Sequence, residues 1–473
     1  MEAAAKVGRL TRSSLQAASC PAVNGGVVVF FAAVVAGALV SASWMSTGAR
    51  LLRRYQGRVP DLDLMFDCQD LPVVNAGDRR GRTSSSPPPL FGYCGSEPTL
   101  DIAFPDWSFW GWPELNIKPW ETLRGEIADG NAAVNWTGRA PYAYWKGNPT
   151  VGADRRNLLR CNASGKRDWN ARIYEQDWRK EVRDGFRESD LAKQCTHRAC
   201  SSVCRYKIYI EGRGWSVSEK YILACDSVAL IVRPRYHDFF SRGLMPLQHY
   251  WPIPGGGRGM CRWIKFAVDW GNAHADKAQE IAGNATRFIQ EDLTMDRVYD
   301  YMFHLLTEYA KLLKYKPTVP DRAVEVTMES MTRGRRGRER QFMVDTMVEA
   351  GSGTGEPCEL PPPFSTEELE TLRRRQADAE EELIINVTIE VTDRRRPSAL
   401  HNDTRPFDRM GWVNAHQEFL VTVPPELSLS LSSCHSLHRR ATTVLKLPSS
   451  SELGRTVGSV AFTFAVEPPP ARG

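Results

Sequence analysis

The sequence lacks the short motifs that mark several large classes of enzyme. Its 473 residues contain no G-x-S-x-G, no H-E-x-x-H and no Walker pattern, which argues against serine hydrolases, zinc proteases and P-loop nucleotidases. His237, His249 and His274 show no catalytic spacing, so we interpret them as structural. The chain also has no internal repeat and no C-terminal endoplasmic-reticulum retrieval signal.

A strong excess of one charge is absent as well. The formal net charge is +5 and acidic residues are interleaved with basic ones, so we expect no nucleic-acid partner. The local exception is the arginine-rich stretch at 333–340. A solvated loop is the favoured interpretation of this stretch, and a nucleic-acid-binding arm is the alternative.

One long apolar run stands out, at residues 25–45. It has about twenty uncharged residues, which is enough to span a bilayer. No convincing small-residue cleavage site follows it, so we expect a membrane anchor, with a removed signal peptide as the alternative. Basic residues flank the run on both sides, so charge alone does not orient it.

The cysteines and glycosylation sequons give the orientation. Of the 11 cysteines only Cys20 precedes the apolar run. Cysteines combined with sequons favour an oxidising, glycosylating lumen, so we expect a type II single-pass protein of the Golgi or endoplasmic reticulum membrane with a lumenal bulk. The cysteine cluster at 195–204 favours disulfides over zinc. The sequons lie at Asn135, Asn162, Asn284, Asn386 and Asn402.

Residues 206–253 carry the main fold signal. The pattern predicts a strand at 206–210, a turn containing Gly212 and Gly214, a helix at 220–225 that Ser216 and Ser218 could cap, and a buried strand at 228–232. A glycine turn between a strand and a helix aims backbone N–H groups at one point, which suits a phosphate. Alternating strands and helices indicate a mainly parallel α/β architecture.

Periodicity and composition predict further elements elsewhere in the chain. These are strands within 60–74 and 141–148, a charged helix within 169–193, and helices at 275–290, 294–314 and 367–383.

The segment 67–70 ends a predicted strand with two carboxylates. Sites in open α/β sheets lie beyond the carboxyl ends of strands, and a carboxylate such as Asp70 could accept a proton there. A turn-capping aspartate fits the same pattern. The pair Asp61 and Asp63 also matches a short acidic metal motif, but the match is unspecific and we expect no metal site.

Basic and aromatic stretches offer two more candidates. Lys146 and Gly147, followed by Arg155 and Arg156, could neutralise a diphosphate; a solvated loop is the alternative. The aromatic residues of 104–120 could stack on a sugar or a nucleobase, although core packing is the favoured interpretation.

Four long motifs in this order resemble glycosyltransferase family 90, the family of Rumi-type protein O-glucosyltransferases, and its plant branch most of all. The resemblance covers residues from about 50 to 383. The motifs are GRVPDLDLMFDCQDLP, PDWSFWGWPELNIKPW, YAYWKGNPTVGADRRNLLRCN and YKIYIEGRGWSVSEKYILACDS with its continuation DFFSRGLMPLQHYWPI.

The resemblance implies a GT-B fold, in which two Rossmann-like domains face each other across a cleft. It implies an inverting transfer of glucose or xylose from UDP-glucose or UDP-xylose to a protein or polysaccharide hydroxyl, with no cofactor and no required metal. The family's catalytic base falls on Asp70. The family's donor-binding segments fall on Lys146, Gly147, Arg155, Arg156, Gly212, Gly214, Ser216, Ser218, Glu219 and Lys220.

This chain departs from the family pattern in two ways. Lys146 replaces an arginine of the Rumi-type members, and Ser218 stands where they have another arginine. The cysteine-containing region that precedes the first motif in the family is missing, so we expect a shortened acceptor-side domain. The alternative function is therefore a catalytically impaired, non-enzymatic family member.

Together these observations predict a chain of seven segments. They are a cytosolic tail (1–24), a transmembrane anchor (25–45), a stem (46–58), a partial acceptor-side Rossmann-like domain (59–140), a donor-binding Rossmann-like domain (141–320), a family extension (321–384) and a disordered tail (385–473).

Overall fold

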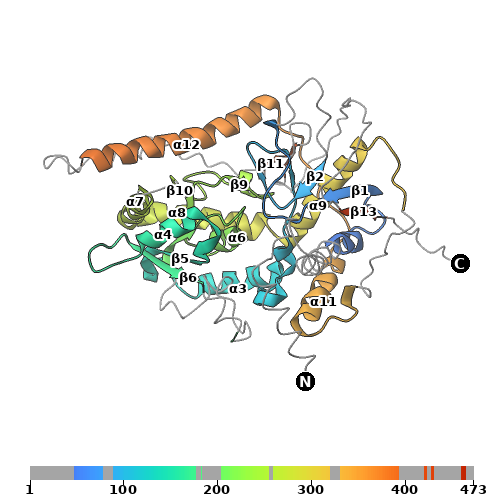
Figure 1. Cartoon of the computed structure of the whole chain (residues 1–473), viewed down its shortest axis with the longest axis horizontal. Coiled ribbons are helices and arrows are strands. Elements are labelled where there is room, and N and C mark those ends of the chain that lie inside the picture. Colours follow the sequence, from blue (N-terminus) through green and yellow to red (C-terminus); the bar gives the residue numbers. More distant parts are fainter. Residues whose placement is uncertain are drawn as a thin grey trace, which may run out of the picture.

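The computed structural model describes residues 47–77, 89–176, 204–254, 259–319 and 331–393, with the backbone of three short strands beyond them. The predicted anchor at 25–45 and most of the cysteine cluster at 195–204 lie outside the described residues. Within the described residues, no helix has the length and apolar character needed to cross a membrane. The expected α/β fold with parallel sheets is confirmed (Figure 1).

The larger sheet has five parallel strands. In chain order they are β5 (Ala140–Gly147), β6 (Ala171–Glu175), β7 (Cys204–Tyr209), β8 (Val228–Val232) and β10 (Trp251–Ile253). Their order in space is β10-β8-β7-β5-β6, and every pairing is parallel. The chain thus adds β6 on one side of β5 and then β7, β8 and β10 on the other side. The order of the strands reverses between β5 and β7. Ligands of open α/β sheets bind at such a switch point, beyond the carboxyl ends of the strands.

The smaller sheet lies on the other side of the molecule. Its core strand is β1 (Leu62–Phe66), where three alternate side chains are buried, as expected for a strand with one face on the core. β1 pairs in parallel with β2 (Leu90–Gly92), and β2 pairs in parallel with β4 (Ile102–Ala103). The other edge of β1 is covered by the antiparallel strand β13 (Val460–Phe464), from the region predicted as a disordered tail. The same region contains β11 (Leu420–Thr422) and β12 (Ser428–Ser430).

Helices cover the larger sheet. On one face, α7 (Met260–Ala273) and α8 (Ala275–Arg287) share an apolar core with β5 to β8. The other core runs from α6 (Ser218–Leu223) to the smaller sheet and includes α3 (Trp120–Ala132) and α9 (Met295–Leu312). One apolar cluster thus joins the two sheets, so they bury surface against each other.

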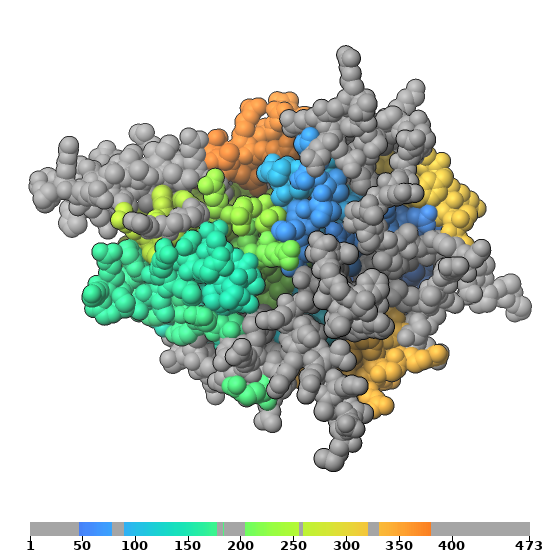
Figure 2. Space-filling model, viewed as in Figure 1, coloured from blue at the N-terminus to red at the C-terminus, as the bar shows by residue number. Residues whose placement is uncertain are grey.

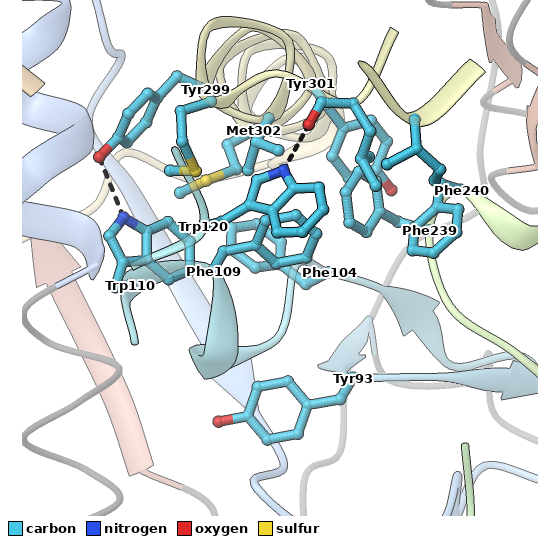
Figure 3. Packing of buried hydrophobic residues seen from close by; sticks show 14 of the residues in the cluster. Tyr93, Phe104, Phe109, Trp110, Trp120, Phe239, Phe240, Tyr299, Tyr301 and Met302 are labelled. Carbon is cyan, nitrogen blue, oxygen red and sulfur yellow. Dashed lines mark hydrogen bonds between the residues drawn. The ribbon is translucent and has the colours of Figure 1, made fainter. Parts of the chain in front are cut away.

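One helix of this core, α9, packs against the smaller sheet. The predicted boundaries assign its residues to the donor-binding domain. In the structure Tyr301 Oη donates to Ala103 O (2.7 Å) and Tyr309 Oη donates to Asp63 O (3.1 Å). Figure 3 shows α9 side chains meeting Trp110 and Phe109 in this core.

Several predicted elements need correction. A charged helix was expected within 169–193, but residues Ala171–Glu175 form the edge strand β6, because Ala171 and Ile173 are buried in the core. Most of 177–193 lies outside the described residues. The stretch 333–340, interpreted as a loop, enters α11 (Gly337–Gly351). The helix predicted at 367–383 is the longer α12 (Thr366–Asp393), which extends along one edge of the molecule (Figure 1).

A disulfide fastens the larger sheet. Cys161, within the connection between β5 and β6, is bonded to Cys261 in the first turn of α7, 100 residues later. Both cysteines are buried in the core shared by the sheet and α7. The bond therefore restricts a long loop in the unfolded chain, which is where disulfides contribute most of their stabilisation in the chain-entropy account.

We predict that replacing both cysteines, Cys161→Ala with Cys261→Ala, lowers the free energy of unfolding by about 2–5 kcal/mol, because the unfolded chain regains the entropy of this loop. Urea denaturation of the double variant and the parent protein measures the difference. Adding a thiol reductant should destabilise the parent by more than the variant. An unchanged unfolding midpoint in the double variant would contradict the prediction.

Candidate active site

The carboxyl ends of the two sheets meet at Asp70 and Gly214. Asp70 lies four residues beyond β1, and Gly214 lies five residues beyond β7. A Cβ atom built on Gly214 would lie 1.7 Å from the backbone oxygen of Asp70. No side chain fits in that space, so glycine is required here by close backbone approach rather than by an unusual φ. In Figure 2 the blue N-terminal part and the light-green part around 204–254 abut on the same face.

The neighbouring loops reinforce this contact. Cys94, two residues beyond β2, donates its thiol to Asp70 O at 3.4 Å, and the rings of Tyr93 and Trp215 lie 5.3 Å apart. Next along the chain, β3 (Gly95–Ser96) pairs with β9 (Tyr236–His237), which follows β8. Residues that follow four parallel strands therefore converge on one region.

Two carboxylates at the end of β1 have different roles. Asp67 Oδ1 accepts from the backbone N–H of Gln69 at 3.0 Å, so Asp67 is the turn-capping residue. The Asp70 carboxylate accepts no hydrogen bond within the described residues and is half-buried. Burial raises the pKa of Asp70 above its ordinary value, and the charge of Arg213 opposes that rise. Asp67 Oδ2 is buried without a hydrogen-bond partner in the described residues, and burial raises the pKa of Asp67 too. The two acids differ in that Asp67 caps the turn through Oδ1 and Asp70, in the described part of the chain, caps nothing.

Arg155 holds the turn that follows β7. Its Nε donates to Glu211 O at 2.8 Å, and its Nη2 donates to Ile210 O at 3.0 Å and to Ser216 Oγ at 3.3 Å. The guanidinium also lies 5.7 Å from the centre of the Trp145 ring. Burial lowers the pKa of Arg155 to about 10. The guanidinium is engaged by the protein, so Arg155 fixes the shape of the turn.

The other predicted residues of β5 and α4 (Ala153–Leu158) lie near this turn. Lys146 is half-buried at the end of β5, at the switch point of the sheet. A Cβ on Gly147 would come within 2.7 Å of the Trp145 ring, so a larger residue would displace that ring. Arg156 is exposed and donates to Thr150 O at 3.1 Å.

The predicted serine caps are wrong. Val217 is the N-cap of α6, without a side-chain hydrogen bond, and α6 has only six residues. The hydroxyl groups of Ser216 and Ser218 lie 2.9 Å apart and bond to each other. The backbone N–H of Ser216 donates to Tyr209 Oη at 3.2 Å. Within the turn, the backbone N–H groups of Gly212 and Ser216 therefore already have partners inside the protein.

Lys220 is buried between the two sheets. It is 1% exposed, and its Nζ donates to Ser108 Oγ at 2.5 Å and lies 3.5 Å from Asp106 Oδ2. The ammonium also lies 4.4 Å from the centre of the Phe109 ring. All three partners belong to the segment around η2 (Trp107–Trp110), which precedes α3. Lys220 therefore links α6 to the smaller sheet's side of the core, and a donor contact is not the role its position supports.

Two buried acids lie beside this lysine. Ser241 Oγ donates to Asp238 Oδ1 at 2.7 Å and is within hydrogen-bond distance of Glu219 Oε2, at 3.1 Å. Asp238 Oδ1 also accepts from the backbone N–H groups of Phe240 and Ser241. Burial raises the pKa of Asp238 to about 7 and raises the pKa of Glu219 well above its ordinary value. Burial therefore favours the protonated form of both acids.

The aromatic stretch is core, as favoured from the sequence. Trp110 Nε1 donates to Tyr299 Oη at 3.0 Å, and Trp120 Nε1 donates to Leu293 O at 2.6 Å. Both indoles are buried together with Phe104 and Phe109 (Figure 3). Their polar atoms are satisfied within the protein, so these rings are not a sugar-stacking surface.

The histidines are structural where they are described. Burial lowers the pKa of His237 to about 3 and that of His249 to about 4. His249 Nδ1 accepts from the backbone N–H of Met245 at 2.9 Å. In the described part of the chain, no group of three or more potential ligands could hold a metal ion. Among the predicted sequons, Asn135 and Asn162 are exposed and Asn284 is half-buried.

Sequence reasoning missed Arg213 and Trp215. Arg213 is the exposed tip of the turn, between the two predicted glycines. Trp215 is buried, and within the described residues its Nε1 has no hydrogen-bond partner. Their position inside the G-x-G-x-S pattern was the available signal, because any side chain in such a turn lies near the ligand.

Comparison with known proteins places these features in a family. The family model described as Glycosyl transferase family 90 matches residues 41–385, more than half of the chain. Protein O-glucosyltransferase 1 of Bos taurus is 27% identical over 271 residues, 55% of this chain and 65% of its own length. The O-glucosyltransferase rumi homolog of Aedes aegypti is 27% identical over 278 residues, which are 57% of this chain and 66% of that protein. The O-glucosyltransferase rumi of Drosophila melanogaster is 25% identical over 278 residues, which are 57% of this chain and 64% of that protein. The chain thus spans about two thirds of the length of these relatives.

We predict that Gly214→Ala destabilises the protein by about 2–3 kcal/mol, because the new methyl group must displace the Asp70 backbone. Gly283→Ala is the matched control. Gly283 lies within α8 with no atom near its would-be Cβ, so alanine should stabilise the helix by about 0.5–1 kcal/mol. Thermal and urea denaturation of both variants test this. Equal stability of the two variants would show that the loops do not need this close approach.

We also predict that the stability of the protein depends on pH through the titration of Asp238. A carboxyl whose folded pKa is raised binds its proton more tightly in the folded state, so its contribution is fully present below the unfolded pKa and is lost as pH rises through the folded value. Stability should therefore fall between about pH 4 and about pH 7. Asp238→Asn should flatten this slope, measured by urea denaturation at pH 5 and pH 8. A slope as steep as the parent's would contradict the assignment.

Proposed function

The chain belongs to glycosyl transferase family 90, and on that premise we propose that it is an inverting O-glycosyltransferase. The proposed donor is UDP-glucose or UDP-xylose, and the proposed acceptor is a hydroxyl group of a protein or glycan. The observation that carries this proposal is Asp70: a half-buried carboxylate without a hydrogen bond in the described residues, at the carboxyl end of a parallel strand. The relatives named protein O-glucosyltransferase support the choice of reaction.

We further propose that the two sheets are the two halves of a GT-B fold. The support is their geometry: both sheets are built on parallel strands, and the loops at their carboxyl ends meet. In the proposed arrangement the larger sheet binds the donor at its switch point, between β5 and β7. The loop after β1 then contributes the base from the opposite side.

The proposed chemistry is a single displacement. The Asp70 carboxylate accepts the proton of the acceptor hydroxyl as that oxygen attacks C1 of the donor sugar. The bond between C1 and the diphosphate oxygen breaks on the opposite face, and its electron pair leaves with UDP. One base and a stabilised leaving group suffice for inversion, so no second carboxylate is needed.

The proposed location is the lumen of the Golgi or endoplasmic reticulum, with residues 25–45 as a type II anchor. The buried disulfide between Cys161 and Cys261 supports an oxidising compartment, because such bonds are rare in the cytosol. The exposed sequons at Asn135 and Asn162 are compatible with that compartment.

The first test is donor use by the full-length protein. We expect it to bind UDP and to release UDP from UDP-glucose or UDP-xylose but not from UDP-galactose. Isothermal titration with UDP and a UDP-release assay with each donor provide the measurement. Binding without release, with every acceptor class supplied, would favour the catalytically impaired alternative; absence of UDP binding would refute the enzyme proposal itself.

The second test separates the base from the turn cap. Asp70→Asn should lower the transfer rate by at least about a thousandfold, since it removes the proton acceptor, while UDP affinity stays within about twofold. Asp67→Asn is the matched control, because its amide oxygen can still accept from Gln69. If Asp67→Asn were the inactive variant and Asp70→Asn the active one, the assignment would be reversed.

The pH profile gives a third readout of Asp70. The base must be ionised, so the rate should fall as pH decreases through its pKa. Because burial raises that pKa, the acid limb should lie above the range of an ordinary aspartate. The kcat/KM profile of the free enzyme measures it. An acid limb at or below the ordinary aspartate value would contradict the environment described for this carboxyl.

A further inference from the structure

The cations predicted to meet the donor are mostly engaged by the protein. Arg155 donates to carbonyl oxygens of the β7 turn, and Lys220 is buried against Asp106 and Ser108. Lys146 is half-buried and also has protein partners. A diphosphate that replaced the partners of Arg155 would release the turn that Arg155 holds. Arg156 is exposed, but it lies on α4 and donates to Thr150 O. Within the turn that faces Asp70, the remaining cation that could meet the leaving group is Arg213.

Arg213 has the position and the freedom for that role. It is exposed at the tip of the turn, and its guanidinium donates no hydrogen bond within the described residues. Its neighbours on both sides are fixed: Gly212 N–H donates to Gly214 O at 3.1 Å, and Gly214 lies against the Asp70 backbone. A charged side chain thus extends from a backbone segment that is held on both sides.

The surroundings of this tip favour an anion. The turn follows β7, one of the two strands at the switch point of the larger sheet. Arg155 donates three hydrogen bonds to the turn and so holds the tip in place beside the end of β7. The charge of Arg213 opposes the rise that burial causes in the pKa of Asp70, so the two side chains are near each other. In the proposed reaction the diphosphate leaves on the face of C1 opposite the base, so the Arg213 side chain has to extend past the sugar, toward the larger sheet, to reach it.

We propose that Arg213 binds the diphosphate of the nucleotide sugar and stabilises it as the leaving group. This inference rests on the proposed function and deepens it by assigning the phosphate contact to one residue. Arginine suits the task because its planar guanidinium can donate two parallel hydrogen bonds to phosphate oxygens. In the absence of donor, the same charge keeps Asp70 closer to its ionised form.

The experiment compares UDP with uridine on the full-length protein. We expect Arg213→Ala to weaken UDP binding roughly tenfold to hundredfold, which corresponds to the loss of charge-assisted hydrogen bonds. Uridine lacks the phosphates, so its affinity should not change. Arg213→Lys should recover part of the UDP affinity, and the salt dependence of UDP binding should be shallower in Arg213→Ala than in the parent.

The control is Arg160→Ala, which removes an exposed arginine beside the buried disulfide cysteine Cys161. It should leave both affinities unchanged. Unchanged UDP affinity in Arg213→Ala would overturn the inference while leaving the proposed function intact. Equal weakening of UDP and uridine would also overturn it, because that pattern indicates a distorted turn. Failure of the parent protein to bind UDP would instead overturn the proposed function, and the inference with it.

Discussion

The backbone contact between Gly214 and Asp70 is the constraint on which the rest of the arrangement depends. It fixes the distance between the carboxyl ends of the two sheets, because no side chain separates them. Arg155 shapes the turn on one side of the contact, and Cys94 holds the loop on the other. The base and the proposed phosphate cation are thereby placed on two facing loops whose separation is set by main-chain atoms rather than by flexible side chains.

The junction behind this contact is polar, and that polarity has a cost. Lys220, Asp106, Glu219 and Asp238 are all buried there, and burying charges is favourable only when hydrogen bonds and opposite charges compensate. The network provides both, through Ser108 on one side and Ser241 on the other. Such a network fixes one relative position of α6 and the segment before α3, whereas apolar packing alone would tolerate sliding. Burial raises the pKa of Asp238, and the hydrogen bond from Ser241 and the charge of Lys220 oppose that rise.

Sequence patterns predicted the strands and helices whose buried side chains follow a regular spacing along the chain. β8 is a continuous apolar run that is buried on both faces, and the predicted strand at 228–232 has its bounds. β1 and α9 followed from alternation and helical spacing. The edge strand β6 was missed because it has only five residues and two of them, Arg172 and Glu175, are charged. The roles of Arg155 and Lys220 could not be predicted, since their partners are carbonyls and acids far away in the sequence; Ser108 lies 112 residues from Lys220. The assignment of Asp70 as the base came from the resemblance and stays a prediction, and the structure adds that Asp67, rather than Asp70, caps the turn.

The packing of α9 also has a consequence for the order in which the protein is made. Tyr309 bonds to the backbone of Asp63, and Tyr299 bonds to Trp110, so the first strands to leave the ribosome find their partners nearly last. Until residue 312 has emerged, the tryptophans of the smaller sheet lack the helix that covers them. The larger sheet lies between these segments in the sequence and can complete its own core earlier. We therefore expect the nascent chain to depend on chaperones at the strands β1, β2 and β4, with the loop that carries Asp70 assembled only after the larger sheet has folded.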